Sequence, residues 1–298
     1  MPRALVLGGT GLIGGATARR LRQAGWTVDA PGREVDREDP GAIARALGDG
    51  ADLLVDCLCY TAAHARTLLP LARNASSTVM ISAKAVYADD LGRHVNSDEP
   101  PRFESPVTED QPTLAPENSD PFTREGYGPN KVAAERTLLD SGLPITVLRP
   151  SKVHGPGNKR PLEAYFVDRV LAGEREIALA CRGEGADHPS AAANIAALVE
   201  TAALRPGTRV LNAADPDAPN GLEISRIIAR SLGHEWREVL LDHDESGRHP
   251  WHRIPPFVLD TSAALALGYE PVGDYAATVQ ETLRDLVSSR SWQDRSRE

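Results

Sequence analysis

The sequence has few cysteines, no long hydrophobic run and no basic cluster, and each absence excludes a class of protein. Its three cysteines, Cys57, Cys59 and Cys181, are too few and too unevenly spaced for a disulfide framework or a zinc site. We therefore predict no metal site and a reducing compartment. The opening "MPRALVLGGTG" does not resemble a secretory signal, and no stretch reaches 18 uninterrupted apolar residues. These features predict a cytoplasmic protein with no membrane segment.

The charge balance is acidic. The 298 residues carry 33 Lys and Arg against 42 Asp and Glu, a formal net charge of -9. Proteins that bind nucleic acid or anionic membranes need clustered Lys and Arg, and the sequence has no such cluster. We therefore predict a small-molecule substrate, with no nucleic-acid or membrane partner.

Short apolar runs alternate with helical patterns through the first half of the chain. The strand-like runs are 3–9, 26–30, 51–59 and 77–83, and the helical patterns are 13–25, 40–50 and 62–75. A further strand, 143–153, follows a helix that begins near Tyr127. Strands separated by helices indicate right-handed βαβ units and a parallel sheet.

Two later regions break this alternation. Residues 88–126 contain six prolines and many polar side chains, which predicts a surface loop bordering a site. After residue 155 the pattern becomes mixed, with helices at 162–173 and 223–233 and a strand at 208–214.

These patterns predict an α/β fold, in which a Rossmann-type doubly wound parallel sheet carries a smaller mixed α/β C-terminal substrate lobe. We assign residues 1–153 to the dinucleotide-binding domain, with 189–212 returning to it. The substrate lobe comprises 154–188 and 213–298.

A glycine-rich turn stands between the first strand and the first helix. "LVLGGTGLIGGATARRL" places Gly8, Gly11 and Gly14 three residues apart. Glycine permits a tight turn, lets the backbone approach a pyrophosphate and lets helix and strand pack closely, while the helix N-terminus attracts negative charge. The predicted cofactor-binding residues of this turn are Gly8, Thr10, Gly11, Leu12, Ile13 and Gly14.

The residues after the second strand bear on the choice of cofactor. A carboxylate there binds the ribose 2'-hydroxyl of NAD, whereas an arginine accommodates the 2'-phosphate of NADP. "WTVDAPGRE" ends in Arg33, and Arg37 follows. Asp29 argues for NAD, but it lies within the strand and not at its tip. We predict NADP, with NAD possible, and Arg33 as a cofactor residue.

Tyr127 and Lys131 stand four apart in "EGYGPNK", where a helix begins. Residues i and i+4 share one helix face, so the phenol and the ammonium can point into the same space. A cation near a phenol lowers its pKa, which would make Tyr127 a proton donor and acceptor near neutral pH. A chance pairing is the alternative that these residues alone leave open.

The motif "GGTGLIG", followed much later by "YGPNK", resembles the extended short-chain dehydrogenase/reductase family, also called the NAD-dependent epimerase/dehydratase family. The resemblance continues in "LRPSKVHGPG" (148–157), "RVLNAADPDAPNGLEISRIIARSLG" (209–233) and "LALGYEPVGDYAATVQETLRDL" (265–286). It implies that Tyr127 is the catalytic acid/base and that Lys131 holds the nicotinamide ribose. It also implies a possible homodimer that pairs through the Tyr127 helix.

The sequence departs from this family where a third catalytic group is expected. The family's Ser or Thr stands four residues before a tyrosine that is Tyr87 here, and that position holds Ala83. Ser82 or Lys84 could replace the missing donor, the substrate could supply a polar group, or the enzyme could be slow or inactive. Because Tyr127 and Lys131 are present, we favour the first two alternatives. The stretch also lacks the Thr-Asp-Glu of nucleotide-sugar 4,6-dehydratases, which argues against that reaction.

Three further positions are candidates. His154 replaces the tyrosine of the family's Val-Tyr-Gly-Pro stretch and is, with Lys84, a predicted substrate-binding residue. Lys159 and Arg160 could hold a substrate phosphate or be simply solvated. Asn194 is predicted to cap the helix that follows it.

Three functions remain open from the sequence. The first is an NAD(P)-dependent oxidoreductase of the ketoreductase or alcohol dehydrogenase type, acting on a small polar or natural-product carbonyl. The second is a nucleotide-sugar epimerase, in which the same hydride is removed and returned. The third is a non-catalytic NADP-binding sensor, which Ala83 supports and the pair Tyr127 and Lys131 opposes.

Overall fold

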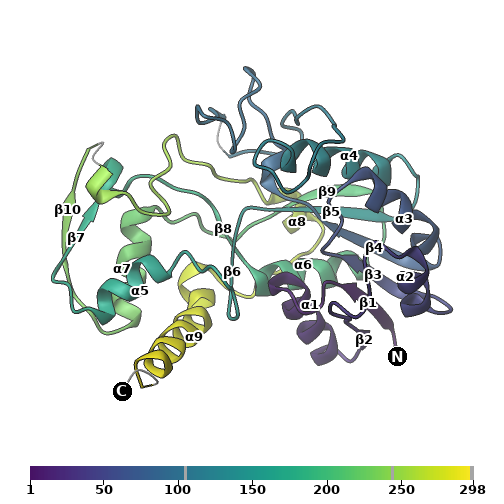
Figure 1. Cartoon of the computed structure of the whole chain (residues 1–298), viewed down its shortest axis with the longest axis horizontal. Coiled ribbons are helices and arrows are strands. Elements are labelled where there is room, and N and C mark those ends of the chain that lie inside the picture. The colour runs from purple at the N-terminus through teal and green to yellow at the C-terminus, as the bar shows by residue number, and fades with distance from the viewer. Residues whose placement is uncertain (104–105, 243–244, 296–298) are drawn as a thin grey trace.

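A six-stranded parallel sheet forms the centre of the molecule, with strand order β2-β1-β3-β4-β5-β9. The computed structural model describes residues 1–103, 106–242 and 245–295 (Figure 1). The strands of the sheet are β1 (Arg3–Leu7), β2 (Thr27–Asp29), β3 (Ala51–Asp56), β4 (Ala75–Ile81), β5 (Ile145–Pro150) and β9 (Arg209–Ala213). The order reverses between β1 and β3, so the predicted Rossmann-type fold is confirmed.

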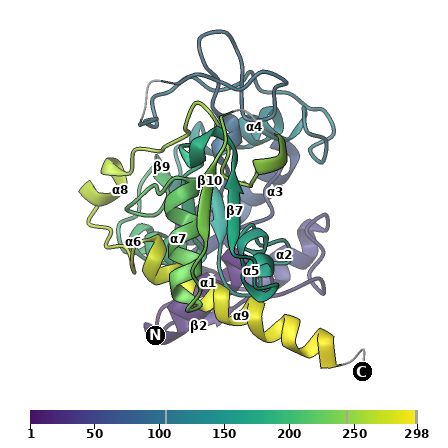
Figure 2. The same ribbon diagram turned by 90° about the vertical axis from the view of Figure 1, so that its left-hand side faces the viewer.

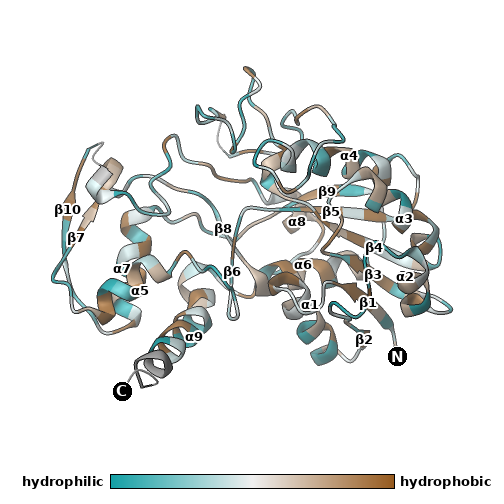
Figure 3. Cartoon of the chain, in the orientation of Figure 1, coloured by the Kyte–Doolittle hydropathy of each residue, from teal (hydrophilic) through white to brown (hydrophobic). Residues whose placement is uncertain are grey.

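Helices cover both faces of this sheet, as Figure 1 shows. One face packs against α1 (Leu12–Gln23) and α6 (Ala192–Leu204), and the other against α2 (Pro40–Leu47), α3 (Ala62–Ala72) and α4 (Tyr127–Leu139). Successive residues of β1 alternate between the two cores, with Ala4 and Val6 in the first and Leu5 and Leu7 in the second. Strands buried on both faces are therefore mostly apolar, and Figure 3 shows this hydrophobic band along the central strands.

The second lobe lies beside the carboxyl ends of the strands. Its elements are α5 (Ala164–Leu171), β7 (Glu176–Leu179), α7 (Gly221–Ser231), β10 (Arg237–Leu240) and α9 (Tyr275–Arg295). Helix α8 (Ser262–Ala266) packs instead against β9 of the main sheet. Strands β7 and β10 pair in parallel at the outer end of the lobe, where Figure 2 shows them beside α7. Phe166 of α5 stacks on Trp251 in a separate core, with ring centroids 5.9 Å apart. Among the described helices none is long and apolar enough to cross a membrane.

The strand predicted at 143–153 is interrupted. β5 ends at Pro150, and the chain resumes as β6 (Lys152–His154), which leaves the main sheet and pairs with β8 (Pro189–Ala191). Between the two strands, the backbone N–H of Ser151 donates to the hydroxyl of Ser190 at 3.0 Å. The apolar run predicted one strand because its periodicity does not change where the chain passes from one sheet to the other.

The prediction that Asn194 caps a helix is wrong. α6 begins at Ala192, and its N-cap residue makes no side-chain hydrogen bond. The Asn194 amide instead donates to Asp215 Oδ1 at 2.8 Å, and its oxygen accepts from the backbone N–H of Val272 at 2.7 Å. Asn194 therefore ties α6 to the segment that leads into α9.

The described parts of the proline-rich loop, 88–103 and 106–126, are irregular, as predicted, and a buried asparagine at the end of β9 anchors them. Asn212 donates to the carbonyl oxygens of Val107 and Asp260, both at 2.9 Å. Its own side-chain oxygen accepts from the Tyr87 hydroxyl at 2.6 Å. One fully buried amide thus fixes the loop and the segment before α8 to the sheet.

Replacing Asn212 with alanine should lower the free energy of unfolding by about 2–4 kcal/mol, because three hydrogen bonds of a fully buried amide are lost. Urea denaturation measures the change. Asn74→Ala, in the exposed turn between α3 and β4, is the matched control. Equal stability of the two variants would contradict this role of Asn212.

Candidate active site

The glycine turn between β1 and α1 is as tight as the sequence predicts. Gly8 has φ +84°, in the left-handed region, and its carbonyl accepts from the N–H of Gly11 at 2.9 Å. A Cβ on Gly14 would lie 2.2 Å from that same carbonyl oxygen. The turn and the first turn of α1 can therefore pack this closely only with glycine at position 14.

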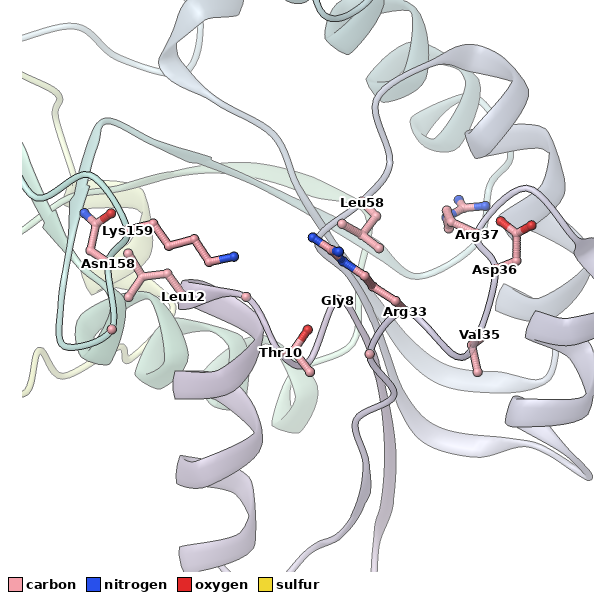
Figure 4. Close-up of a pocket in the computed structure, with 13 residues that line it drawn as sticks. Gly8, Thr10, Leu12, Arg33, Val35, Asp36, Arg37, Leu58, Asn158 and Lys159 are labelled. Atoms are coloured by element: carbon pink, nitrogen blue, oxygen red, sulfur yellow. The ribbon is translucent and has the colours of Figure 1, made fainter.

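A cavity of about 600 Å³ opens beside this turn. Figure 4 shows its lining, to which the glycine turn, the segment after β2 and a loop of the second lobe all contribute. The lining residues are Gly8, Thr10, Gly11, Leu12, Gly32, Arg33, Val35, Asp36, Arg37, Leu58, Gly157, Asn158 and Lys159. Five of the eight predicted cofactor residues are in this set. Gly14 instead packs under the turn, Ile13 packs against the core, and Lys131 lies at the other end of the site.

The segment after β2 places Arg33 in the wall of the cavity and the Glu34 carboxylate beside Gly32, whose N–H donates to Glu34 Oε1 at 2.7 Å. The N–H of Gly9 donates to the carbonyl of Pro31 at 3.2 Å, so the extended chain runs past Asp29 to Gly32. The Asp29 carboxylate points back to Arg3, whose Nη2 lies 2.7 Å from it. Arg33 therefore lines the cavity where the predicted cofactor would place its ribose, and Asp29 is held elsewhere.

Arg37 contributes a second guanidinium to the same wall. Its Nη2 lies 2.6 Å from Asp56 Oδ2, with both side chains buried, and also donates to the carbonyl of His64 at 2.9 Å. Its buried Nη1 has no hydrogen-bond partner among the described residues. The Arg37 guanidinium is therefore balanced by Asp56, and Arg33 is the cation on this wall that remains for an anionic dinucleotide.

Lys131 is buried at the carboxyl ends of two neighbouring strands. Its ammonium donates to the carbonyl oxygens of Cys59, after β3, and Ile81, the last residue of β4, both at 2.9 Å. The ammonium lies 4.5 Å from the ring centroid of Tyr60 and 5.9 Å from that of Tyr127. Because an ammonium has three donors, one remains for a ligand.

The loop before α4 and the turn after β4 hold Tyr127 in place. A Cβ on Gly128 would lie 2.5 Å from the carbonyl oxygen of Ala85, so the helix presses against that turn. The Asn130 amide donates to the carbonyl of Ser119 at 2.9 Å, which ties the incoming loop to the helix. The motif "YGPNK" therefore has a packing role as well as a chemical one.

The predicted lowering of the Tyr127 pKa is wrong for the protein without bound ligands. Burial, with a smaller contribution from the nearby Tyr60 phenol, raises the pKa of Tyr127 to about 12. Burial likewise lowers the pKa of Lys131, against the opposing influence of Cys59 and Asp56. Desolvation is therefore the largest influence on the pKa of each group, and it keeps the Tyr127 phenol neutral at neutral pH.

Ser82, the first candidate for the missing hydroxyl, lies on the opposite side of the strand end. Its buried hydroxyl donates to Glu135 Oε1, and Glu135 is also paired with Arg149, whose Nη2 lies 2.6 Å from Oε2. The alternation of side chains along an extended chain accounts for this placement beside Ala83. The hydroxyl is occupied within a buried polar cluster, and we do not assign it to catalysis.

Lys84, the second candidate, forms a buried ion pair with Asp187. Lys152 lies 3.3 Å and Arg253 3.7 Å from the same carboxylate, so three cations surround one acid. Burial, followed by repulsion from Lys152 and Arg253, lowers the pKa of Lys84 well below its usual value. Asp187 rather than a substrate is therefore the partner of Lys84 here.

A second cavity, of about 560 Å³, lies over this cluster. The loop 88–126 and the second lobe line it together, and Arg124, only three residues before Tyr127, forms part of its wall. The lining residues are Val95, Ser97, Asp98, Pro100, Arg124, Lys152, Cys181, Asp187, Arg248, Pro250, His252, Arg253 and Ile254. The cavity therefore adjoins the N-terminus of α4.

His154, the other predicted substrate residue, lines neither cavity. It is buried, with Nε2 2.8 Å from Asp215 Oδ2 and its ring centroid 5.1 Å from that of Tyr275. It joins β6 to the segment after β9 and to the start of α9. The motif that suggested a substrate contact is thus part of the packing between the lobes.

Sequence reasoning missed Tyr60, Asp187 and Arg253. Tyr60 packs against both members of the predicted pair, with its ring centroid 6.5 Å from that of Tyr127. Its position directly after the apolar run at 51–59 was a usable signal, because residues that follow parallel strands gather at one edge of the sheet. Asp187 and Arg253 carried no such signal.

Comparison with known proteins is consistent with this geometry. A UDP-glucose-4-epimerase from Stenotrophomonas maltophila, with bound NAD and formylated UDP-arabinopyranose, is 18% identical, with 98% of this chain and 100% of that chain covered and a TM-score of 0.73. A UDP-N-acetylglucosamine 4-epimerase from Bacillus cereus is also 18% identical (96% and 99% covered, TM-score 0.72), as is RMD from Pseudomonas aeruginosa complexed with NADPH (97% and 100%, TM-score 0.70). These likenesses show the fold alone.

No curated protein sequence matches the chain. The model of the NAD dependent epimerase/dehydratase family, however, matches residues 4–186, which is more than half of the 298 residues. The protein therefore belongs to the NAD-dependent epimerase/dehydratase family, a family of nicotinamide-dependent enzymes.

Proposed function

We propose that this enzyme interconverts a hydroxyl and a carbonyl on a polar, anionic substrate, with Tyr127 as the acid/base, and that nucleotide-sugar epimerisation is the leading form of this reaction. The observation that carries the proposal is the placement of Lys131. Its ammonium is held by the carbonyls of Cys59 and Ile81 at the strand ends, next to the cofactor cavity. This placement suits a group that holds the nicotinamide end of a dinucleotide.

The bound nicotinamide would supply or accept the hydride. The glycine turn and Arg33 would hold its diphosphate and ribose, and the remaining Lys131 donor would hold its second ribose. Tyr127 would take the proton from a substrate hydroxyl when a ketone forms and return it when the ketone is reduced. Its raised pKa keeps the phenol protonated at neutral pH. A protonated phenol suits the step in which the ketone is reduced and its oxygen takes up a proton.

The second cavity supports an anionic substrate. Lys152, Arg253 and Arg124 line it together with two acids. Asp187 lies near Lys152 and Arg253, and Asp98 lies 3.2 Å from Arg124. Guanidinium and ammonium groups gathered around a cavity suit phosphate or carboxylate oxygens. Nucleotide sugars carry a diphosphate, and two of the similar solved structures are epimerases of such compounds by name.

A ketoreductase is the second candidate, and the end of β2 favours it. Arg33, with Arg37 beside it, suits NADP, which serves mostly in reductions, and RMD from Pseudomonas aeruginosa was solved with NADPH. The two reactions differ in cofactor balance. An epimerase consumes no net NADPH, whereas a reductase consumes one NADPH for each ketone reduced.

This difference defines the test. The enzyme is incubated with a panel of UDP- and dTDP-sugars without added reductant, and sugar interconversion is followed by chromatography. In parallel, NADPH oxidation is followed against a panel of ketones. Interconversion supports the epimerase, and stoichiometric NADPH oxidation supports the reductase. Tight NADPH binding with neither reaction would favour a sensor, to which Ala83 at the position of the family's hydroxyl points.

Replacing Tyr127 with phenylalanine should reduce kcat by about 10²- to 10⁴-fold, because it removes the proton donor and keeps the ring. Dinucleotide affinity should change little. Steady-state kinetics and NADPH fluorescence titration measure the two quantities. Tyr165→Phe, in α5 and away from both cavities, is the control. Full activity of the Tyr127 variant would exclude the assigned role.

The pH dependence should follow from the raised pKa of Tyr127. Oxidation of a hydroxyl needs the phenolate, which is the minor form below pH 12. We therefore expect kcat/KM for the oxidative direction to rise about tenfold per pH unit from pH 7 to 9.5. A plateau below pH 8 would contradict this and would mean that Lys131 outweighs burial in the ligand-bound enzyme.

Replacing Arg33 with alanine should weaken NADPH binding by about 10- to 100-fold and leave NADH binding nearly unchanged, because a charge-assisted contact to the 2'-phosphate is lost. Fluorescence titration with each nucleotide measures the effect. Arg66→Ala, on an exposed face of α3, serves as the matched control. An equal loss of affinity for NADPH and NADH would show that Arg33 does not contact the 2'-phosphate.

A further inference from the structure

One wall of the cofactor cavity comes from the second lobe. Gly157, Asn158 and Lys159, in the loop after β6, line the cavity opposite Gly32 and Arg33. Figure 4 shows the Lys159 and Arg33 side chains extending toward each other over the turn that carries Gly8 and Thr10. Two cations thus converge on one space from different lobes.

Contacts with both lobes fix the position of this loop. A Cβ on Gly155 would lie 3.2 Å from Leu12 Cδ1, so the chain leaving β6 passes directly against the start of α1. The N–H of Gly157 donates to Asp285 Oδ2 of α9 at 2.9 Å. Asn158 completes a turn by accepting from the N–H of Arg160 at 3.0 Å. The backbone that carries Lys159 is therefore placed by packing.

The charge in this part of the cavity is not balanced by the protein. Within the described residues neither Lys159 nor Arg33 forms an ion pair, although the chain as a whole carries a net charge of -9. The carboxylate of Asp36 lines the far end, where its Oδ1 accepts from the N–H of Glu38 at 2.9 Å. Like charges that converge without an intervening acid repel each other unless a ligand anion lies between them.

We propose that Lys159 binds the diphosphate of the dinucleotide from the side opposite the glycine turn, so that the bound cofactor bridges the two lobes. This assignment rests on the proposed function, because it requires a dinucleotide in the first cavity. The assignment gives each of two cations its own part of the cofactor. Arg33, at the tip of the extended chain after β2, contacts the adenosine ribose, and Lys159, over the start of α1, contacts the diphosphate.

Ligand fragments test this separation. Dissociation constants are measured for NADPH, ADP and adenosine 2'-monophosphate with the full-length enzyme and its variants, by fluorescence titration and by competition with NADPH. Lys159→Met should weaken NADPH and ADP about 10- to 100-fold and leave adenosine 2'-monophosphate within threefold. Lys159→Arg should retain affinity for ADP. Arg160→Met, one residue further and outside the cavity lining, is the control.

Two outcomes would overturn the proposal in distinguishable ways. If wild type and Lys159→Met bind ADP and NADPH equally well, Lys159 has no contact with the diphosphate, and the proposed function stands. If Lys159→Met and Arg160→Met weaken all three ligands equally, only general charge is involved, and the specific contact is excluded. If the wild-type enzyme binds neither NADPH nor ADP, the proposed function fails together with this assignment.

Discussion

Two hydrogen bonds from the Lys131 ammonium, to the carbonyl oxygens of Cys59 and Ile81, set the geometry of the active site. A buried ammonium is costly unless it is fully partnered, so α4 cannot shift along the sheet without breaking both bonds. Tyr127 lies one turn earlier on the same helix and is therefore fixed relative to the ends of β3 and β4. The same helix face contributes Glu135, one turn after Lys131, and its pairing with Arg149 holds this part of the helix against the sheet.

The electrostatic effect of this pair depends on what surrounds it. At the level of sequence, an ammonium one turn from a phenol suggests an acidic tyrosine, because only the attraction between the two groups is visible. In the folded protein Tyr60 packs against both groups, and desolvation acts on each of them separately. The charged phenolate loses more from burial than it gains from an ammonium 5.9 Å from its ring. The ground state is thus a neutral phenol, which is ready to donate a proton.

The features that the sequence predicted are those whose partners are close in the chain. The turn from Gly8 to Gly14 and the pair Tyr127 and Lys131 are local patterns, and alternation alone predicted the parallel sheet. The role of Lys84 was missed because its partner, Asp187, is about a hundred residues away, and nothing in the local pattern indicates that ion pair. The packing of one lobe on the other determines where the side chains of Lys84 and Asp187 point, and the periodicity of the sequence does not predict that packing.

The placement of cations also bears on the missing hydroxyl at Ala83. In the cofactor cavity Arg37 is neutralised by Asp56, whereas Arg33 and Lys159 have no such acid within the described residues, so this cavity keeps a positive potential suited to a dinucleotide. At the second cavity three cations, Lys84, Lys152 and Arg253, share the single carboxylate of Asp187, so positive charge remains there for an anionic group. Under the proposed function, with no serine beside the reacting carbon, the remote anionic group of the substrate is left to orient it. The binding free energy of that group would then contribute to catalysis, because a fixed remote group limits the orientations in which the substrate approaches Tyr127.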